Sequence, residues 1–311
     1  SQPPAFQQFL LHTSILDRMT GPLCDALLAT DPSADCRLQI ADGRTGHVNA
    51  LNVAPTCGTA DPSRSEGGAA QRGAQPAALV LEQLERANLF LIPLDGEGRW
   101  FRYHHLFADL LRFRLQQRHP ERVASLHQRA ARWFAGQDLT DEAVQHALAA
   151  GDTDLAAGLI AAEGRAWLTR GELATLGRWL DAMPAAAFAA HPRLTLLRAW
   201  ILVWAYQPAS VAALLAPLAA APPPELAAEL LALRAFVARS RDAWDEATRL
   251  SEQALAVAPD DPLLQGFLHA GLGDMAWFRE QPQQALVCHR CALECAARGG
   301  DLVQLIDAVH T

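Results

Sequence analysis

The chain has 311 residues, of which 50% are hydrophobic and 19% are charged, and its formal net charge is -8. This length and apolar content suffice for one large domain or two ordinary ones, which excludes a wholly disordered protein. None of its 26 basic residues is a lysine, so the chain holds neither a Schiff-base lysine nor the G-x-x-x-x-G-K-[ST] loop that binds nucleotide phosphates.

The charge balance and the cysteine content limit the partners and the cellular compartment that we expect for the protein. An acidic chain without a basic stripe argues against direct nucleic-acid binding. Its apolar stretches, such as 194–203, are too short for a membrane span. Six cysteines without a regular spacing indicate a reducing cytoplasm rather than a disulfide framework. The chain starts with Ser and stops inside a periodic segment at 302–309, so we expect it to be a piece of a larger protein.

The first quarter of the chain contains two predicted helices and one irregular stretch. Residues 1–30 show two short apolar faces, and the Thr-Gly-Pro at 20–22 is a typical start for the second helix. Residues 31–78 carry turn pairs such as Gly67-Gly68 among small polar residues, with no sustained period. We therefore expect 31–78 to be an irregular insertion or linker.

The stretch from 79 to 115 predicts a hairpin between two helices. Two short apolar runs, 89–94 and 99–103, flank Asp95-Gly96, which is a strong hairpin signal. A helix should follow, with an apolar face made of Tyr103, Leu106, Phe107, Leu110 and Leu111. Three helices, a hairpin and a further helix outline a winged-helix domain, which we assign to residues 1–118.

Residues 119–311 predict paired helices without strands. The breaks between helices fall at Gly136, Gly151, Gly171 and Pro184. Near the end the pattern repeats, because Ala247 and Ala254 recur 38 residues later as Ala285 and Ala292. Small residues seven apart let a paired helix approach closely, as in tetratricopeptide repeats. The expected fold is therefore mostly α, a winged helix with a short β-hairpin followed by an α-solenoid of TPR-like helix pairs.

Four strings in this sequence resemble a known family. Residues 9–18, 21–26, 81–90 and above all 100–111, which read WFRYHHLFADLL, are similar to the large LuxR-type, MalT-like transcriptional regulators. Those regulators are ATPases of the STAND class, with a P-loop domain, a winged helix, a helical-repeat sensor domain and a C-terminal helix-turn-helix. The resemblance is strong over 1–30 and 79–170. The irregular stretch before residue 78 departs from it, because the family has a much shorter connection there.

The resemblance implies a role for one histidine. In this wider class of ATPases, the winged helix carries a Met-His-Asp motif whose histidine contacts the β-phosphate of bound ADP. His104 matches that histidine, whereas Tyr103 and His105 replace the Met and the Asp. The amides and the dipole at a helix start attract phosphate, which supports the match. The plain alternative is that His104 and His105 cap the helix or pack on the hairpin.

The same resemblance implies cofactors and partners. ATP or ADP would be bound mainly by a P-loop domain outside this chain, with no metal inside it. The partners would be that domain, a C-terminal helix-turn-helix domain, and a small-molecule inducer or a protein on the helical repeats. Self-association on activation is implied as well. No catalytic motif occurs in the sequence, so we do not expect an enzyme.

Three other features of the sequence can be interpreted in two ways. Trp200 and Trp204 stand one helical turn apart, so they either line an inducer groove or belong to the core. Cys288, Cys291 and Cys295 share a helix face, but a closed zinc site needs four ligands, which favours core packing. The arginines that end the predicted helix, namely Arg112, Arg114 and Arg118, are either a solvated helix end or an inter-domain contact.

We therefore expect residues 1–118 to be a winged helix and 119–311 a helical-repeat sensor, together forming the regulatory part of a MalT-like transcriptional activator. In that interpretation the winged helix restrains an ADP-bound ATPase domain. The alternative is a free-standing TPR-type scaffold for protein–protein interactions, against which the winged-helix half of the sequence argues.

Overall fold

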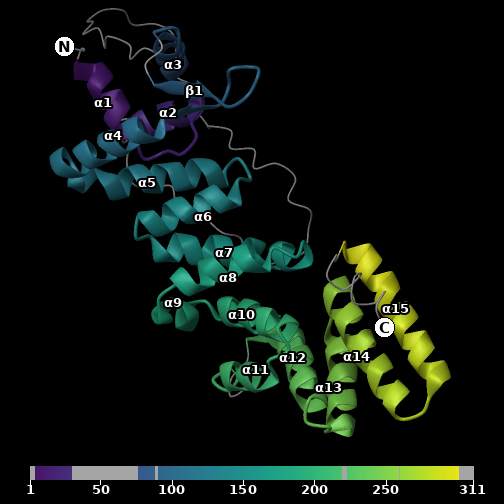
Figure 1. Cartoon of the computed structure of the whole chain (residues 1–311). Coiled ribbons are helices and arrows are strands. Elements are labelled where there is room, and N and C mark those ends of the chain that lie inside the picture. The colour runs from purple at the N-terminus through teal and green to yellow at the C-terminus, as the bar shows by residue number, and fades with distance from the viewer. Residues whose placement is uncertain (1–3, 30–75, 88–89, 219–222, 259, 301–311) are drawn as a thin grey trace, which may run out of the picture. The chain divides into compact units, whose positions relative to one another are not determined.

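The computed structural model describes residues 4–29, 76–87, 90–218, 223–258 and 260–300 (Figure 1). These residues are mostly helical, with one two-stranded sheet. The chain divides into two compact units, Ser1–Pro120 and Glu121–Thr311. Most of the predicted irregular stretch lies outside the described residues, but its last two positions are helical, because a helix already begins at Ala77.

The described part of the first unit contains four helices and a hairpin, in the order of a winged helix. Its elements are α1 (Pro4–Thr13), α2 (Gly21–Leu28), α3 (Ala77–Arg86), β1 (Leu91–Pro93), β2 (Phe101–Tyr103) and α4 (His105–Arg118). Helix α2 begins as predicted, because the Thr20 hydroxyl accepts the Leu23 amide at 3.4 Å. The Asp25 carboxylate accepts the Ala77 amide at 2.9 Å, so the start of α3 is tied to α2.

The hairpin lies around Asp95-Gly96, as the sequence predicted. Strands β1 and β2 pair antiparallel, with Leu91 opposite Tyr103. The turn is held by the Asp95 carboxylate, which accepts the Arg99 amide at 2.8 Å. Met19 adds a third, bridge-like partner, because it exchanges two backbone hydrogen bonds with Phe101 at 2.8 and 2.9 Å. The hairpin is thereby joined to the segment before α2.

The buried face of α4 differs from the predicted one. Ala108, Leu111 and Leu115 are buried, whereas Leu106 and Leu110 are 68% and 45% exposed. The prediction was wrong for those two leucines because α4 is apolar on more than one side, and periodicity alone does not say which side meets the core.

The second unit is built from helices and one short 3₁₀ turn in its described part. They are α5 (Pro120–Ala135), α6 (Thr140–Ala149), α7 (Thr153–Thr169), α8 (Leu173–Ala182), α9 (Ala185–Ala190), α10 (Pro192–Trp204), α11 (Pro208–Leu215), η1 (Pro224–Leu226), α12 (Ala227–Arg239), α13 (Trp244–Val257), α14 (Pro262–Phe278) and α15 (Pro282–Gly299). Successive helices pack on each other, most extensively α12 on α13 and α14 on α15. The predicted helical repeats are confirmed.

Small residues allow this close packing. Ala247 and Ala254 on α13, and Ala285 and Ala292 on α15, are all buried, as their seven-residue spacing predicted. The four predicted breaks also fall between helices. A Cβ added to Gly164 on α7 would lie 2.3 Å from the Cδ1 atom of the fully buried Leu197 on α10. An alanine at this position would force the Leu197 side chain to shift within the core.

We predict opposite effects for two glycine-to-alanine changes. Gly164→Ala should lower the free energy of unfolding by about 1–3 kcal/mol, because the fully buried Leu197 side chain must then shift within a packed core. Gly177→Ala on α8 is the matched control, since nothing lies within 4 Å of the added methyl group. It should raise stability by about 0.5–1 kcal/mol, because it removes a flexible residue from a helix. Urea unfolding of the variants measures both; equal effects would contradict the close contact.

Candidate functional site

His104 lies at the junction between β2 and α4. Its amide donates to the Phe90 carbonyl at 2.7 Å, and its own carbonyl accepts the Phe107 and Ala108 amides at 2.9 and 3.0 Å. It is therefore the N-cap residue of α4, with an extended ψ of 136°, but its side chain makes no capping hydrogen bond. These hydrogen bonds hold the backbone of His104 in place, whereas its ring does not cap the helix.

The rings of His104 and His105 stand together at the start of α4. Their centroids are 4.3 Å apart with an interplanar angle of 31°. His104 is half-buried and His105 is exposed. The first amides of a helix have no acceptor inside the helix, and the dipole makes this end positive. An imidazole N–H beside them completes a set of donors suited to a phosphate.

Tyr103 anchors the residue that precedes this site. Its hydroxyl lies 2.8 Å from the Thr13 Oγ1 atom, and the Thr13 hydroxyl donates to the Phe9 carbonyl at 2.8 Å. The ring also packs edge-to-face on Phe107, with centroids 5.7 Å apart. Burial raises the pKa of Tyr103 well above its usual range, so the hydroxyl stays protonated. Tyr103 therefore has a structural role at the position where the Met-His-Asp motif has Met.

The three arginines of α4 separate into two groups. Arg112 donates to the Ser14 carbonyl at 2.8 Å and pairs with Asp17 at 2.6 Å, so it ties α4 to the end of α1. Arg114 and Arg118 are exposed and line a pocket of about 330 Å³ within the first unit. The solvated helix end predicted for all three therefore does not describe Arg112.

The structure separates Trp200 from Trp204. Trp200 is 1% exposed and packs edge-to-face on Phe267 of α14, with centroids 4.8 Å apart. Its indole N–H has no acceptor among the described residues. Trp204, at the end of α10, is half-buried. The pair does not form one open aromatic face, because Trp200 belongs to the core of the second unit.

A hollow that the sequence did not indicate lies among α11, α12 and the start of α13. Its volume is about 260 Å³. Leu215 and Val237 supply apolar walls, and the exposed Arg234, Arg241 and Glu246 supply charges of both signs. Arg234 is on α12, and Arg241 lies in the turn that follows this helix. Helical periodicity therefore predicts neither that the two arginines are neighbours nor that a cavity lies beside them.

In the cysteine cluster on α15, Cys295 lies beside polar side chains. Cys295 is buried, and its Sγ atom lies 3.4 Å from the Gln265 Oε1 atom and 3.1 Å from the Arg298 Nη2 atom. Burial and the neighbouring Cys291 raise the pKa of the Cys288 thiol. Within the described part of the chain, no group of three or more His, Cys, Asp or Glu side chains is arranged to hold a metal ion.

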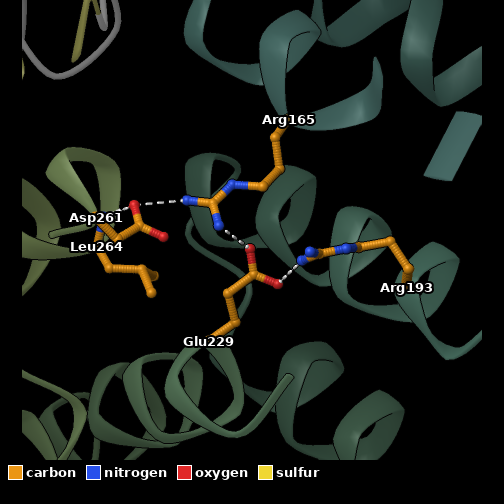
Figure 2. A network of polar contacts seen from close by, with 5 residues as sticks. All are labelled: Arg165, Arg193, Glu229, Asp261 and Leu264. Atoms are coloured by element: carbon orange, nitrogen blue, oxygen red, sulfur yellow. Dashed lines mark hydrogen bonds and ion pairs between the residues drawn. The ribbon is translucent and has the colours of Figure 1, made fainter. Parts of the chain in front are cut away.

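A buried carboxylate links four segments of the second unit (Figure 2). Glu229 on α12 is 3% exposed. Arg165 on α7 approaches its Oε1 atom at 2.9 Å, and Arg193 on α10 pairs with its Oε2 atom. Arg165 also reaches Asp261 at 2.8 Å, and Asp261 caps α14 through the Leu264 amide. The partners lie 36 to 96 positions apart, so no local pattern could have indicated them.

The comparisons with known proteins show what the first unit resembles. A family model described as the MalT winged helix domain matches residues 1–44 and 68–123. The first unit is similar to that domain over most of its length. The "HTH-type transcriptional regulator MalT" of Cronobacter sakazakii is 36% identical over 191 residues, and that of Klebsiella pneumoniae strain 342 is 35% identical over the same length. Each match covers 60% of this chain and 21% of the relative.

The chain is therefore similar to a segment of MalT-like transcriptional regulators, and the match spans about a fifth of their length. The two matched pieces leave residues 45–67 unmatched. His104 and the hairpin before it fall inside the second matched piece. Within the described residues, no helix combines the length and the apolar character that crossing a bilayer requires.

We predict that Glu229 is essential for the stability of the second unit. Glu229→Ala should lower the free energy of unfolding by about 3 kcal/mol, because it leaves Arg193 and part of Arg165 without a counter-charge in a half-buried site. The matched control is Glu172→Ala, which breaks the exposed pair with Arg170 and should cost less than about 1 kcal/mol. Urea unfolding measures both. Equal costs would show that the Glu229 network contributes no more than a surface pair.

Proposed function

We propose that this chain is the regulatory part of a longer MalT-like transcriptional activator, in which the winged helix restrains an ADP-bound nucleotide-binding domain. The MalT winged helix match supports this proposal. The composition supports it too, because a chain without lysine cannot supply the P-loop lysine and must rely on another segment for it. ATP or ADP is then held mainly by that segment, and a helix-turn-helix domain elsewhere contacts DNA.

The observation that carries the proposal is the position of His104. Its ring lies at the N-terminus of α4 without a capping hydrogen bond, beside amides that have no intrahelical acceptor. There it donates to the β-phosphate of ADP and holds the winged helix against the nucleotide. His105 lacks the carboxylate of the resembled motif, so no contact by that group is proposed.

The helical repeats serve as the sensor in this proposal. The hollow beside Arg234 and Arg241 offers an inducer apolar walls, two cations and the carboxylate of Glu246. An inducer that binds the open state better than the closed state shifts the population toward the ATP-bound form, which self-associates. A partner protein on the repeats acts by the same differential affinity.

The test is the ADP affinity of the longer protein that contains both this chain and its nucleotide-binding domain. His104→Ala should weaken ADP binding about 10- to 100-fold, because a hydrogen bond to a charged phosphate is lost. ATP binding should change much less, since the winged helix leaves the nucleotide in that state. Equilibrium dialysis with labelled nucleotides measures both affinities.

His105→Ala is the matched control, because it removes the neighbouring exposed ring but leaves the N-cap residue in place. It should leave ADP affinity within about threefold of the parent, as expected for an exposed substitution. If His104→Ala and His105→Ala leave ADP affinity equally unchanged, the role proposed for His104 is wrong. A longer protein that binds no nucleotide would refute the proposed restraint altogether.

A further inference from the structure

The first unit contains an apolar pocket that the proposed nucleotide contact does not use. Its volume is about 330 Å³, which lies within the range of small-molecule sites. Leu11, Leu84 and Leu111, from α1, α3 and α4, form its floor. All three are at most 7% exposed, so the pocket ends on the core of the winged helix. Three separate helices thus build it.

The rim is formed by aromatic side chains. Phe90 is 58% exposed and stacks on Phe107, with ring centroids 5.0 Å apart. Its φ of +56° is in the left-handed region, which is unfavourable for a bulky residue. The hydrogen bond from the His104 amide to the Phe90 carbonyl holds it there. The fold thus maintains a strained backbone that leaves a large ring at the mouth of the pocket.

The charged end of the pocket is on α4. Phe107, Leu111, Arg114 and Arg118 all line it, and their spacing puts them on one side of the helix. This stripe changes from apolar to cationic along α4. Neither Arg114 nor Arg118 has an ion pair or a side-chain hydrogen bond with another described residue, whereas Arg112 beside them pairs with Asp17. Among the described residues that line the pocket, none is acidic.

From this geometry we propose that the pocket binds a small amphipathic carboxylate, with an apolar body on the leucine floor and its anionic group on Arg114 and Arg118. Arginine is suited to this task because its planar fork can hold both oxygens of a carboxylate. The volume equals that of roughly eleven liquid waters, which suits a chain of about ten carbons. This proposal does not depend on the nucleotide role of His104.

Isothermal titration of the 311-residue chain with decanoate tests the proposal. Decanoate should bind at one site, and raising the salt concentration should weaken it, because the arginines are exposed. 1-Decanol has the same body without charge, and decyltrimethylammonium carries the opposite charge. The alcohol should bind several-fold more weakly than decanoate and the cation should not bind measurably. If all three bind equally, or if decanoate does not bind, the proposal is overturned.

Variants then locate the site. Arg114→Gln with Arg118→Gln should weaken decanoate about five- to tenfold without changing the affinity for 1-decanol, because two exposed charge contacts are lost. Arg102→Gln is the matched control, an exposed arginine on β2 that does not line the pocket, and it should leave the decanoate affinity unchanged. Leu10→Trp fills the pocket and should abolish binding of both ligands.

Circular dichroism identifies any variant that does not fold, and the titration is interpreted only for folded ones. Because Arg114 and Arg118 have no partners to lose among the described residues, their glutamine variants leave the helix content intact. Decanoate affinity that is unchanged in the folded double variant and in Leu10→Trp places the ligand elsewhere and overturns the proposal.

Discussion

The backbone hydrogen bonds around the hairpin control the arrangement of the winged helix. Met19 and Phe101 exchange two of them, and the His104 amide donates a third to Phe90. A two-stranded hairpin is marginal by itself, so this additional pairing is what makes it a fixed part of the unit. It sets the direction in which the chain enters α4, and therefore where the rings of His104 and Phe90 point. The candidate phosphate site and the amphipathic pocket depend on the same few bonds.

In the second unit, the main constraint is that neighbouring helices must approach each other closely. Buried alanines such as Ala247 and Ala285 let neighbouring helices pack without large side chains between them. Larger side chains such as Trp200 and Phe236 fill the core of the same unit. The Glu229 network adds polar links that join α7, α10, α12 and the cap of α14 (Figure 2). A buried charge that has partners only in one arrangement disfavours the others.

The sequence was informative wherever a structure depends on neighbouring residues. Asp95-Gly96 predicted the hairpin, Thr20 predicted the start of α2, and the seven-residue alanine spacing predicted the helical repeats, because turns, caps and helix faces are local. The buried side of α4 and the Glu229 network were not predictable in this way, and for Trp200 the sequence left the choice between core and groove open. Each depends on which distant segment packs there, and local patterns in a single sequence do not show such long-range contacts. His104 was found only through family resemblance.

Phe90 connects the two candidate sites of the winged helix physically. Its ring forms the rim of the pocket, while its carbonyl holds the His104 amide. Phe107 lies on the other side of the same contact, because its ring stacks on Phe90 and its amide donates to the His104 carbonyl. A ligand that fixes these rings therefore acts on the two bonds that position His104. Linkage is reciprocal, so any effect of the pocket ligand on nucleotide affinity must be matched by an equal effect of nucleotide on the ligand.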